Sequence, residues 1–194
     1  MEKYYIVADT HIGGPHPKTV SALEIMELRD KHGDHAILVG DILDGSNCKK
    51  SRWESYSTIY DTLKLMYKDD YVIGNHCFCF PQSWPDKYYV IKNGIFFTHP
   101  LYKYSDDQLN KWRKKRGRSS MYRFLIGLKH KTVPLLGRES KLGKDSLSRA
   151  LLDLEANNCH TFVCGHYHVS EVVDYTAEGK RIVILPRGLT EIEL

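Results

Sequence analysis

The feature that most constrains the fold is an alternation of apolar runs and amphipathic segments near the start of the chain. Short apolar runs predict strands at residues 4–8, 35–40 and 71–74, and helical spacing predicts helices at 17–32 and 51–67 between them. Strands that alternate with helices in this way run parallel within one sheet. The alternation therefore predicts an α/β fold.

The second half of the chain is richer in strands. The predicted elements there are strands at 88–91, 94–98 and 161–165, a helix at 145–156, and a hairpin formed by 169–175 and 181–185. These strands predict a second sheet. A chain of 194 residues has the size of one ordinary domain, so we expect residues 1–194 to form a single domain.

Between residues 101 and 142 the pattern changes to a basic segment, which we expect to be a helical cap insertion. Residues 103–131 hold ten Lys and Arg but only two Asp, a local charge of +8 that leaves −4 for the rest of the chain. An apolar stripe within it either packs on the main domain or lines a substrate groove. The basic side chains are either a solvated helix face or a site for an anion. The candidate substrate-binding residues are Lys111, Arg113, Lys114, Lys115, Arg116, Arg118 and Arg123.

The five cysteines suit neither an even disulfide framework nor a repeated C-x-x-C zinc pattern. We therefore expect reduced thiols in a cytoplasmic protein. No signal peptide is expected, and no run approaches the roughly 18 apolar residues of a transmembrane span.

Side chains that can bind metals follow the predicted strands. The motifs "DTH", "GDILD", "GNH", "THP" and "GHYH" place in order Asp9, His11, Asp41, Asp44, Asn75, His76, His99, His166 and His168. A single polar residue after a strand is usually structural, but five motifs in succession are harder to explain that way. The carboxyl ends of parallel strands meet at one edge of a sheet, so these side chains are expected to lie together.

The donors in these motifs suit divalent metal ions. Mixed carboxylate, amide and imidazole donors fit manganese, with iron or zinc as alternatives, and there are enough of them for two ions that share a carboxylate. Alternation along an extended segment would put His166 and His168 on the same side. Two adjacent metals stabilise the attacking and leaving oxygens in displacement at phosphorus.

The order D-x-H, G-D-x-x-D, G-N-H, H, G-H-x-H resembles the calcineurin-like metallophosphoesterase superfamily. The resemblance implies a four-layer α/β/β/α sandwich of two mixed sheets with a dinuclear centre at one edge. It implies that Asp41 bridges the metals and that His76 assists the leaving group from outside the metal shell. It assigns one metal to Asp9, His11 and His168, and the other to Asn75, His99 and His166.

The chain departs from related motifs at two positions. Protein phosphatases of this superfamily continue the second motif with Arg-Gly, whereas Gly45 follows Asp44 here, which disfavours a phosphoprotein substrate. The third motif usually has an acid after its histidine, where this chain has Cys77. The cap is reminiscent of UDP-2,3-diacylglucosamine hydrolases, but those enzymes typically have arginine at the position of His76, so the cap is an analogy only.

The leading hypothesis is a two-metal phosphoesterase that hydrolyses a phosphomonoester, phosphodiester or pyrophosphate bond by attack of metal-bound hydroxide. Its substrate would be a phosphate-containing small molecule or a nucleotide-like compound. The alternative is a nuclease or polynucleotide phosphatase that binds nucleic acid through the basic insertion. A catalytically silent binding scaffold is a third hypothesis, although such a scaffold should lack ligands and none is missing here. The oligomeric state stays open.

Overall fold

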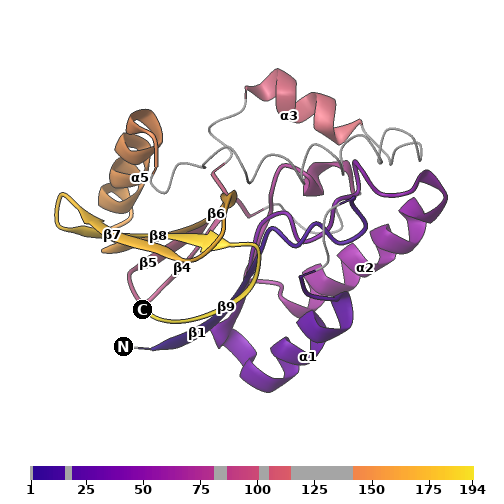
Figure 1. Cartoon of the computed structure of the whole chain (residues 1–194), viewed down its shortest axis with the longest axis horizontal. Coiled ribbons are helices and arrows are strands. Elements are labelled where there is room, and N and C mark those ends of the chain that lie inside the picture. Colours follow the sequence, from indigo (N-terminus) through magenta and orange to yellow (C-terminus); the bar gives the residue numbers. More distant parts are fainter. Residues whose placement is uncertain (1, 16–18, 81–86, 101–104, 115–141) are drawn as a thin grey trace.

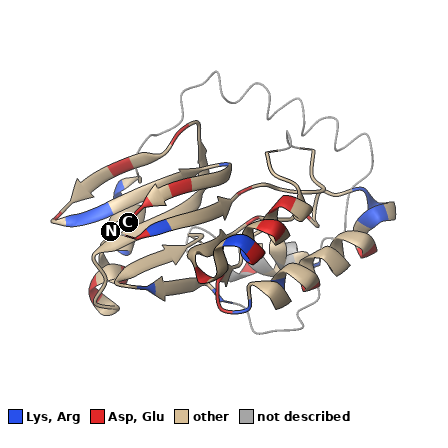
Figure 2. Ribbon diagram, turned by 90° about the horizontal axis from the view of Figure 1, so that it is seen from below, with Lys and Arg blue, Asp and Glu red and all other residues tan. Residues whose placement is uncertain are grey.

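The computed structural model describes residues 2–15, 19–80, 87–100, 105–114 and 142–194. The helices within these ranges are α1 (Ala22–His32), α2 (Trp53–Met66), α3 (Asp106–Arg113) and α5 (Lys144–Ala156). Three short 3-10 turns accompany them: η1 (Gly33–His35), η2 (Lys50–Arg52) and η3 (Cys77–Cys79). Figure 2 shows that charged residues of both signs are spread over the helices and strands.

Sheet 1 contains the three parallel strands of the predicted alternation. Its strands are β1 (Lys3–Ala8), β2 (Ala36–Val39), β3 (Tyr71–Val72) and β9 (Gly188–Glu193), in the order β3-β2-β1-β9. The pairs β1–β2 and β2–β3 are parallel, and β1–β9 is antiparallel. Because β9 joins β1, Glu2 and Leu194 are neighbours and exchange two backbone hydrogen bonds of 2.9 and 3.0 Å.

Sheet 2 collects the strands of the second half of the chain. Its strands are β4 (Tyr89–Lys92), β5 (Ile95–Thr98), β6 (Thr161–Val169), β7 (Val173–Ala177) and β8 (Lys180–Pro186), in the order β4-β5-β6-β8-β7. The pairs β5–β6 and β6–β8 are parallel, and both edge strands are antiparallel to their neighbours. The prediction of two mixed sheets is confirmed.

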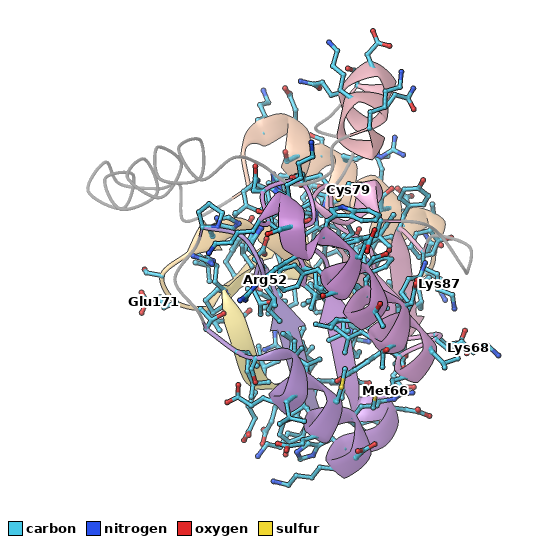
Figure 3. The ribbon with its side chains drawn as sticks, turned by 90° about the vertical axis from the view of Figure 1, so that its right-hand side faces the viewer. Arg52, Met66, Lys68, Cys79, Lys87 and Glu171 are labelled. Atoms are coloured by element: carbon cyan, nitrogen blue, oxygen red, sulfur yellow. The ribbon has the colours of Figure 1, made fainter. Side chains whose placement is uncertain are left out.

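The two sheets pack face to face between helical layers (Figure 1). Alternate residues of β1 and β2 decide the layering: Ile6 and Ile37 face sheet 2, whereas Val7 and Leu38 face α1 and α2. Phe162 of β6 faces α5 on the other side. Figure 3 turns the α1 and α2 layer toward the viewer, with Met66 labelled at the end of α2. The layers are α/β/β/α, as the resemblance implies.

Two predicted elements have other bounds in the structure, and one strand was missed. The hairpin strand expected at 169–175 is β7 (Val173–Ala177), because Val169 still belongs to β6. The first helix was expected from residue 17, but α1 begins at Ala22, where Ser21 and Glu24 form a capping box. Strand β9 was not predicted, because its polarity is reversed: Leu189 is 48% exposed, whereas Thr190 is 6% exposed. An alternation that exposes leucine and buries threonine does not read as a half-buried strand.

The cap lies mostly outside the described residues. Of the predicted segment 101–142, the structure describes residues 105–114, which include α3, and Leu142. Helix α3 lies next to η3, the turn that follows His76 (Figure 1). Single-domain organisation with a cap remains a prediction. Among the described helices, none is both long and apolar enough to cross a membrane.

Candidate metal centre

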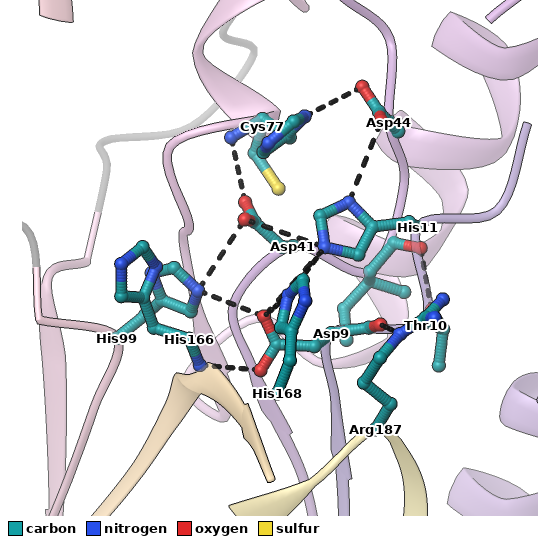
Figure 4. Close-up of polar contacts among 12 residues, drawn as sticks. Asp9, Thr10, His11, Asp41, Asp44, Cys77, His99, His166, His168 and Arg187 are labelled. Carbon is teal, nitrogen blue, oxygen red and sulfur yellow. Dashed lines mark hydrogen bonds and ion pairs between the residues drawn. The ribbon is translucent and has the colours of Figure 1, made fainter. Parts of the chain in front are cut away.

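The strand-end side chains named in the sequence converge at one edge of the two sheets (Figure 4). The segments after β1, β2, β3 and β5 and the end of β6 supply them. Of the seven ligands expected from the resemblance, five are buried, with Asp9 and His99 at 0% exposure; only His166 and His168 are partly exposed, and the His168 side chain is 15% exposed. Such burial is unusual for carboxylates and imidazoles unless they are paired or bind metals.

The backbone at this edge bends sharply. Five of the seven expected ligands have positive φ, namely Asp9 (51°), His11 (49°), Asp41 (48°), His166 (79°) and His168 (51°). Such values are uncommon for residues other than glycine and concentrate at functional sites. The positive φ values at His166 and His168 also correct the expectation of a regular extended segment. The pairing of β6 with β8 shifts register between Cys164 and Val169, so a bend in the backbone turns both imidazoles toward the centre.

The first group of potential ligands is Asp9, His11 and His168, with donor atoms all within 4.8 Å of one another. Nε2 of His168 lies 3.2 Å from Oδ1 of Asp9 and 3.1 Å from Nε2 of His11. Strands β1 and β6 come from different sheets, so this group forms only where the two sheets meet.

The second group is Asp41, His99 and His166, also within 4.8 Å. Asn75 is 2% exposed, and its Oδ1 has no hydrogen-bond partner among the described residues; the same holds for Nδ1 of His99. A buried amide oxygen without a partner is costly unless something else binds it. A cation is a suitable partner for that oxygen.

The carboxylate of Asp41 lies between the two groups. Its Oδ2 is 3.5 Å from Nε2 of His99 and 3.9 Å from Nε2 of His11, while its Oδ1 accepts a 2.7 Å hydrogen bond from the backbone N–H of His76. A Cβ at position 74 would lie 2.2 Å from Oδ1 of Asp41, so only glycine leaves room for the carboxylate there. Of the expected ligands, Asp41 thus has one oxygen fixed by the backbone and the other facing both groups.

His76 lies beside the first group, with its ring edge-on to that of His11 at a centroid distance of 4.6 Å. Nδ1 of His76 is 2.8 Å from Oδ1 of Asp44, a fully buried carboxylate that also accepts hydrogen bonds from Ser46 and from Asn47. Sequence reasoning noted Asp44 within "GDILD" but gave it no role. Its partner is 32 residues away, and no local pattern pairs the two.

Cys77 does not replace the acid that usually follows the histidine of this motif. It is fully buried, and its Sγ lies 3.8 Å from the hydroxyl of Tyr71. Burial raises the pKa of Cys77 to about 12, so the side chain stays a neutral thiol. The carboxylate that contacts the imidazole of His76 is that of Asp44.

The pKa shifts of these groups follow from burial and from their neighbours. Burial alone would raise the pKa of Asp9, but hydrogen bonds from His168 and His99 hold it well below its ordinary value. Burial likewise opposes ionisation of Asp44, but the charge of His76 and contacts with both histidines lower its pKa. Burial is the largest influence on the pKa of His76 and lowers it, but the negative charges of Asp44, Asp41 and Asp9 and the hydrogen bond to Asp44 together outweigh burial, so that pKa is raised. Asp9 and Asp44 are therefore anionic near neutral pH.

The predicted cap residues are only partly described. Lys111 and Lys114 have exposed side chains, and Arg113 is the last residue of α3. Lys115, Arg116, Arg118 and Arg123 lie outside the described residues. Any part that these residues play in binding stays a prediction.

The donor set fits divalent metal ions. The carboxylates and imidazoles of the expected ligands form two groups that meet at Asp41, and a third group of possible donors, His11, Asp44 and His76, lies beside the first; none of the five buried cysteines belongs to any of them. Oxygen and imidazole donors without thiolate favour borderline divalent ions such as Mn²⁺, Fe²⁺ and Zn²⁺.

Comparison with known proteins extends over nearly the whole chain. Residues 3–190 match the calcineurin-like phosphoesterase superfamily domain. No curated protein sequence matches significantly.

Three solved structures illustrate the likeness. A dimetal phosphatase from Danio rerio is 13% identical, with a TM-score of 0.47 over 97% of this chain and 91% of its own. The cold-active protein-tyrosine phosphatase of a psychrophilic Shewanella species is 12% identical, with a TM-score of 0.46 over 100% and 76%. Vacuolar protein sorting 29 from Cryptosporidium parvum is 14% identical, with a TM-score of 0.44 over 96% and 74%.

The match across residues 3–190, on a chain whose two sheets gather carboxylates and imidazoles at one edge, carries the assignment. This chain belongs to the calcineurin-like phosphoesterase superfamily and is a metal-dependent phosphoesterase.

Proposed function

We propose that the chain hydrolyses a phosphomonoester, phosphodiester or pyrophosphate bond with two divalent ions. One ion would be held by Asp9, His11 and His168, the other by Asn75, His99 and His166, with Asp41 between them. The observation that carries this proposal is the meeting of the two donor groups at Asp41, next to a buried oxygen of Asn75 that has no hydrogen-bond partner in the described structure. Two ions at these ligands would polarise the phosphoryl group and lower the pKa of an attacking water molecule.

His76 is the proposed general acid. Its Nδ1 is held by Asp44 at 2.8 Å, which fixes the ring and favours the protonated imidazole. Nε2, on the opposite side of the ring, is the atom from which a proton would pass to the leaving-group oxygen. Such proton transfer typically contributes a factor of about 10² to 10⁴ in rate.

Manganese is the proposed metal, and the cytoplasm the proposed location. The oxygen and imidazole donors suit manganese, and the five free, buried cysteines fit a reducing compartment. The substrate would be a phosphate-containing small molecule or a nucleotide-like compound.

The test compares wild-type protein with Asp41→Asn and His76→Ala variants, using Mn²⁺ with p-nitrophenyl phosphate and its bis ester. We expect the wild type to bind about two metal ions per chain, and both variants to lose most of the activity. Metal content is read by mass spectrometry of protein purified without chelator. Wild-type activity no greater than that of Asp41→Asn would refute the proposal, and a wild type without metal would favour a binding scaffold.

A nuclease or polynucleotide phosphatase is the second candidate. Its support is the position of α3, which carries the exposed Lys111, next to η3, the turn that follows His76. Cleavage of a short oligonucleotide should then weaken steeply as salt rises from 50 to 200 mM, because bound phosphates displace counterions. Cleavage that does not depend on salt would exclude binding of the phosphate backbone by the basic residues of the cap.

A further inference from the structure

A cationic turn lies between the second motif and α2, outside the proposed metal shell. We define it as Lys49, Lys50 and Arg52, all with exposed side chains. The turn is held by backbone hydrogen bonds, from the N–H of Cys48 to the carbonyl of Asp44 (2.9 Å) and from the N–H of Arg52 to the carbonyl of Lys49 (2.9 Å). The cations therefore project from a fixed backbone.

Asn47, two residues before this turn, contacts both Asp44 and His76. Nδ2 of Asn47 donates to Oδ2 of Asp44 (3.0 Å) and lies 3.4 Å from Nδ1 of His76. Lys49 is two residues further along, so its Cα lies within about 7.6 Å of that of Asn47. A lysine or arginine side chain at that distance can reach a group bound beside His76.

Residues on both sides of this turn pack against the end of η3 and the residue after it, Phe80. The ring of Trp53 stacks on that of Phe80 with centroids 5.9 Å apart, and a Cβ on Gly45 would lie 2.4 Å from the Phe80 ring. Figure 3 labels Arg52 and Cys79 on this side of the molecule. Since α3 lies next to η3, the cationic turn and Lys111 are on segments that both border the turn after His76.

The three cations of the turn form no ion pair in the described part of the chain. Some cations elsewhere form ion pairs, namely Lys3 with Glu191, Arg149 with Asp153 and Arg181 with Asp174, whereas the exposed Lys31 and Lys144 form none with the described residues. Glu54, the acid nearest in sequence to the turn, forms none with them. A group of three cations without carboxylate partners produces a positive potential that attracts anions.

We infer that Lys49, Lys50 and Arg52 form a subsite for a second phosphate group of the substrate, next to the phosphate that is attacked. The inference rests on the proposed phosphoesterase function and names its substrate class: compounds with at least two phosphate groups. Arginine binds phosphate oxygens in a bidentate manner, and the lysines add point charges. A nucleoside diphosphate and an oligonucleotide both offer this chemistry.

The test replaces the cationic turn by the triple variant Lys49→Gln, Lys50→Gln and Arg52→Gln. The control carries Lys3→Gln, Lys31→Gln and Lys68→Gln, which remove the same charge from exposed positions at the start of β1 and at or just beyond the C-terminal ends of α1 and α2, away from the sheet edge that holds the centre. Activity of the Mn²⁺-loaded proteins is measured on ADP, on a thymidine octanucleotide and on p-nitrophenyl phosphate. Binding of α,β-methylene-ADP, which has two phosphates and no cleavable bridge, is measured by calorimetry.

We expect the turn variant to bind α,β-methylene-ADP at least about tenfold more weakly than the control, the loss typical of charge-assisted hydrogen bonds. Its loss of kcat/KM should be at least tenfold greater for two-phosphate substrates than for p-nitrophenyl phosphate. A loss limited to the octanucleotide would identify a nucleic-acid strand as the source of the second phosphate. Equal binding of α,β-methylene-ADP by variant and control, with no selective loss on the octanucleotide, would overturn the subsite, even if wild-type activity confirms the phosphoesterase. Absence of all hydrolysis would refute the proposed function, and the calorimetric comparison would still decide the subsite.

Discussion

The pair formed by Asp44 and His76 accounts for the absence of an acid after the histidine of the third motif. Asp44 reaches the imidazole from the second motif, whereas the thiol of Cys77 points to Tyr71. One carboxylate thus orients the ring, and the residue that follows His76 is free to be a core side chain. The position of Cys77 is structural in this chain.

Replacing Asp44 should impair catalysis far more than replacing Cys77. In Asp44→Asn the amide cannot stabilise the protonated imidazole, so we expect kcat to fall by about 10². Cys77→Ser keeps the size of the side chain and should leave kcat within about twofold. Steady-state kinetics on p-nitrophenyl phosphate, with circular dichroism to confirm folding, measures both. A Cys77→Ser loss as large as that of Asp44→Asn would contradict this assignment.

Two glycines with positive φ give a matched pair. A Cβ on Gly40 (φ +72°) would lie 2.2 Å from the ring of His99, while Gly179 (φ +74°) has no atom within 4 Å of that position. Gly179→Ala should cost about 1 kcal/mol of unfolding free energy from backbone strain alone. Gly40→Ala should cost about 3 kcal/mol and abolish activity, because overpacking adds to the strain and displaces His99.

Urea denaturation and the rate on p-nitrophenyl phosphate measure both glycine variants. Gly179→Ala serves as the control, and we expect it to retain full activity. If Gly40→Ala were as stable and as active as Gly179→Ala, the close approach of Gly40 to His99 would be wrong.

The sequence predicted which residues stand at the strand ends but not how they are oriented. The structure brings the expected ligands and His76 together, and their individual roles remain proposals. Asp9 and His168 have a left-handed backbone, and Asp44 contacts His76 across 32 residues. Neither feature produces a recognisable pattern in the local sequence. Both features result from tertiary packing, which neither residue propensities nor hydrophobic alternation along the sequence can predict.

At the scale of elements, the boundaries follow local chemistry. Helix α1 starts at Ala22 because Oγ of Ser21 accepts from the N–H of Glu24 (3.2 Å) and the Glu24 carboxylate accepts from the N–H of Ser21 (2.7 Å). That signal is present in the sequence, but Pro17 is also a typical helix start, so the sequence alone places the helix too early. Strands β1 and β2 were predictable because they are buried, whereas the half-exposed edge strand β9 was not.

Removing the Ser21 side chain measures how much the capping box of α1 contributes to the stability of the protein. Ser21→Ala removes the hydrogen bond that Oγ accepts from the N–H of Glu24, while the backbone N–H of residue 21 can still donate to the Glu24 carboxylate, and the free energy of unfolding should fall by about 1 kcal/mol. Ser55→Ala, at an exposed position within α2, should cost nothing because alanine is the better helix former. Urea unfolding followed by circular dichroism checks the pair, and equal stability of the two variants would argue against the capping box.

At the scale of the whole molecule, the reactivity of the buried cysteines measures how often the whole fold opens. All five are buried, and burial raises the pKa of Cys159 and takes that of Cys77 to about 12. Because the thiolate is the reactive form, raising the pH from 7 to 9 should leave native Cys77 essentially unlabelled. Iodoacetamide should therefore label Cys77 only when the fold opens.

Metal binding should slow this labelling. Mn²⁺ at 100 times its Kd would stabilise the native state by about 2.7 kcal/mol, a factor of about 100 in the unfolded population. Mass spectrometry compares labelling rates with Mn²⁺ and with EDTA, and Asp41→Asn serves as the control with little expected response. Equal rates for wild-type protein with Mn²⁺ and with EDTA would show that no metal binds preferentially to the folded chain.

The candidate centre joins residues that are far apart in the sequence: Asp9 contacts His166 and His168, which are 157 and 159 residues later. A ribosome adding roughly 5 to 20 residues per second needs about 8 to 30 s to go from the aspartate to those histidines. Throughout that interval the nascent chain holds only fragments of a binding site. If these residues bind metal as proposed, we expect the ions to bind only after residues 166 and 168 have been synthesised and the two sheets have come together.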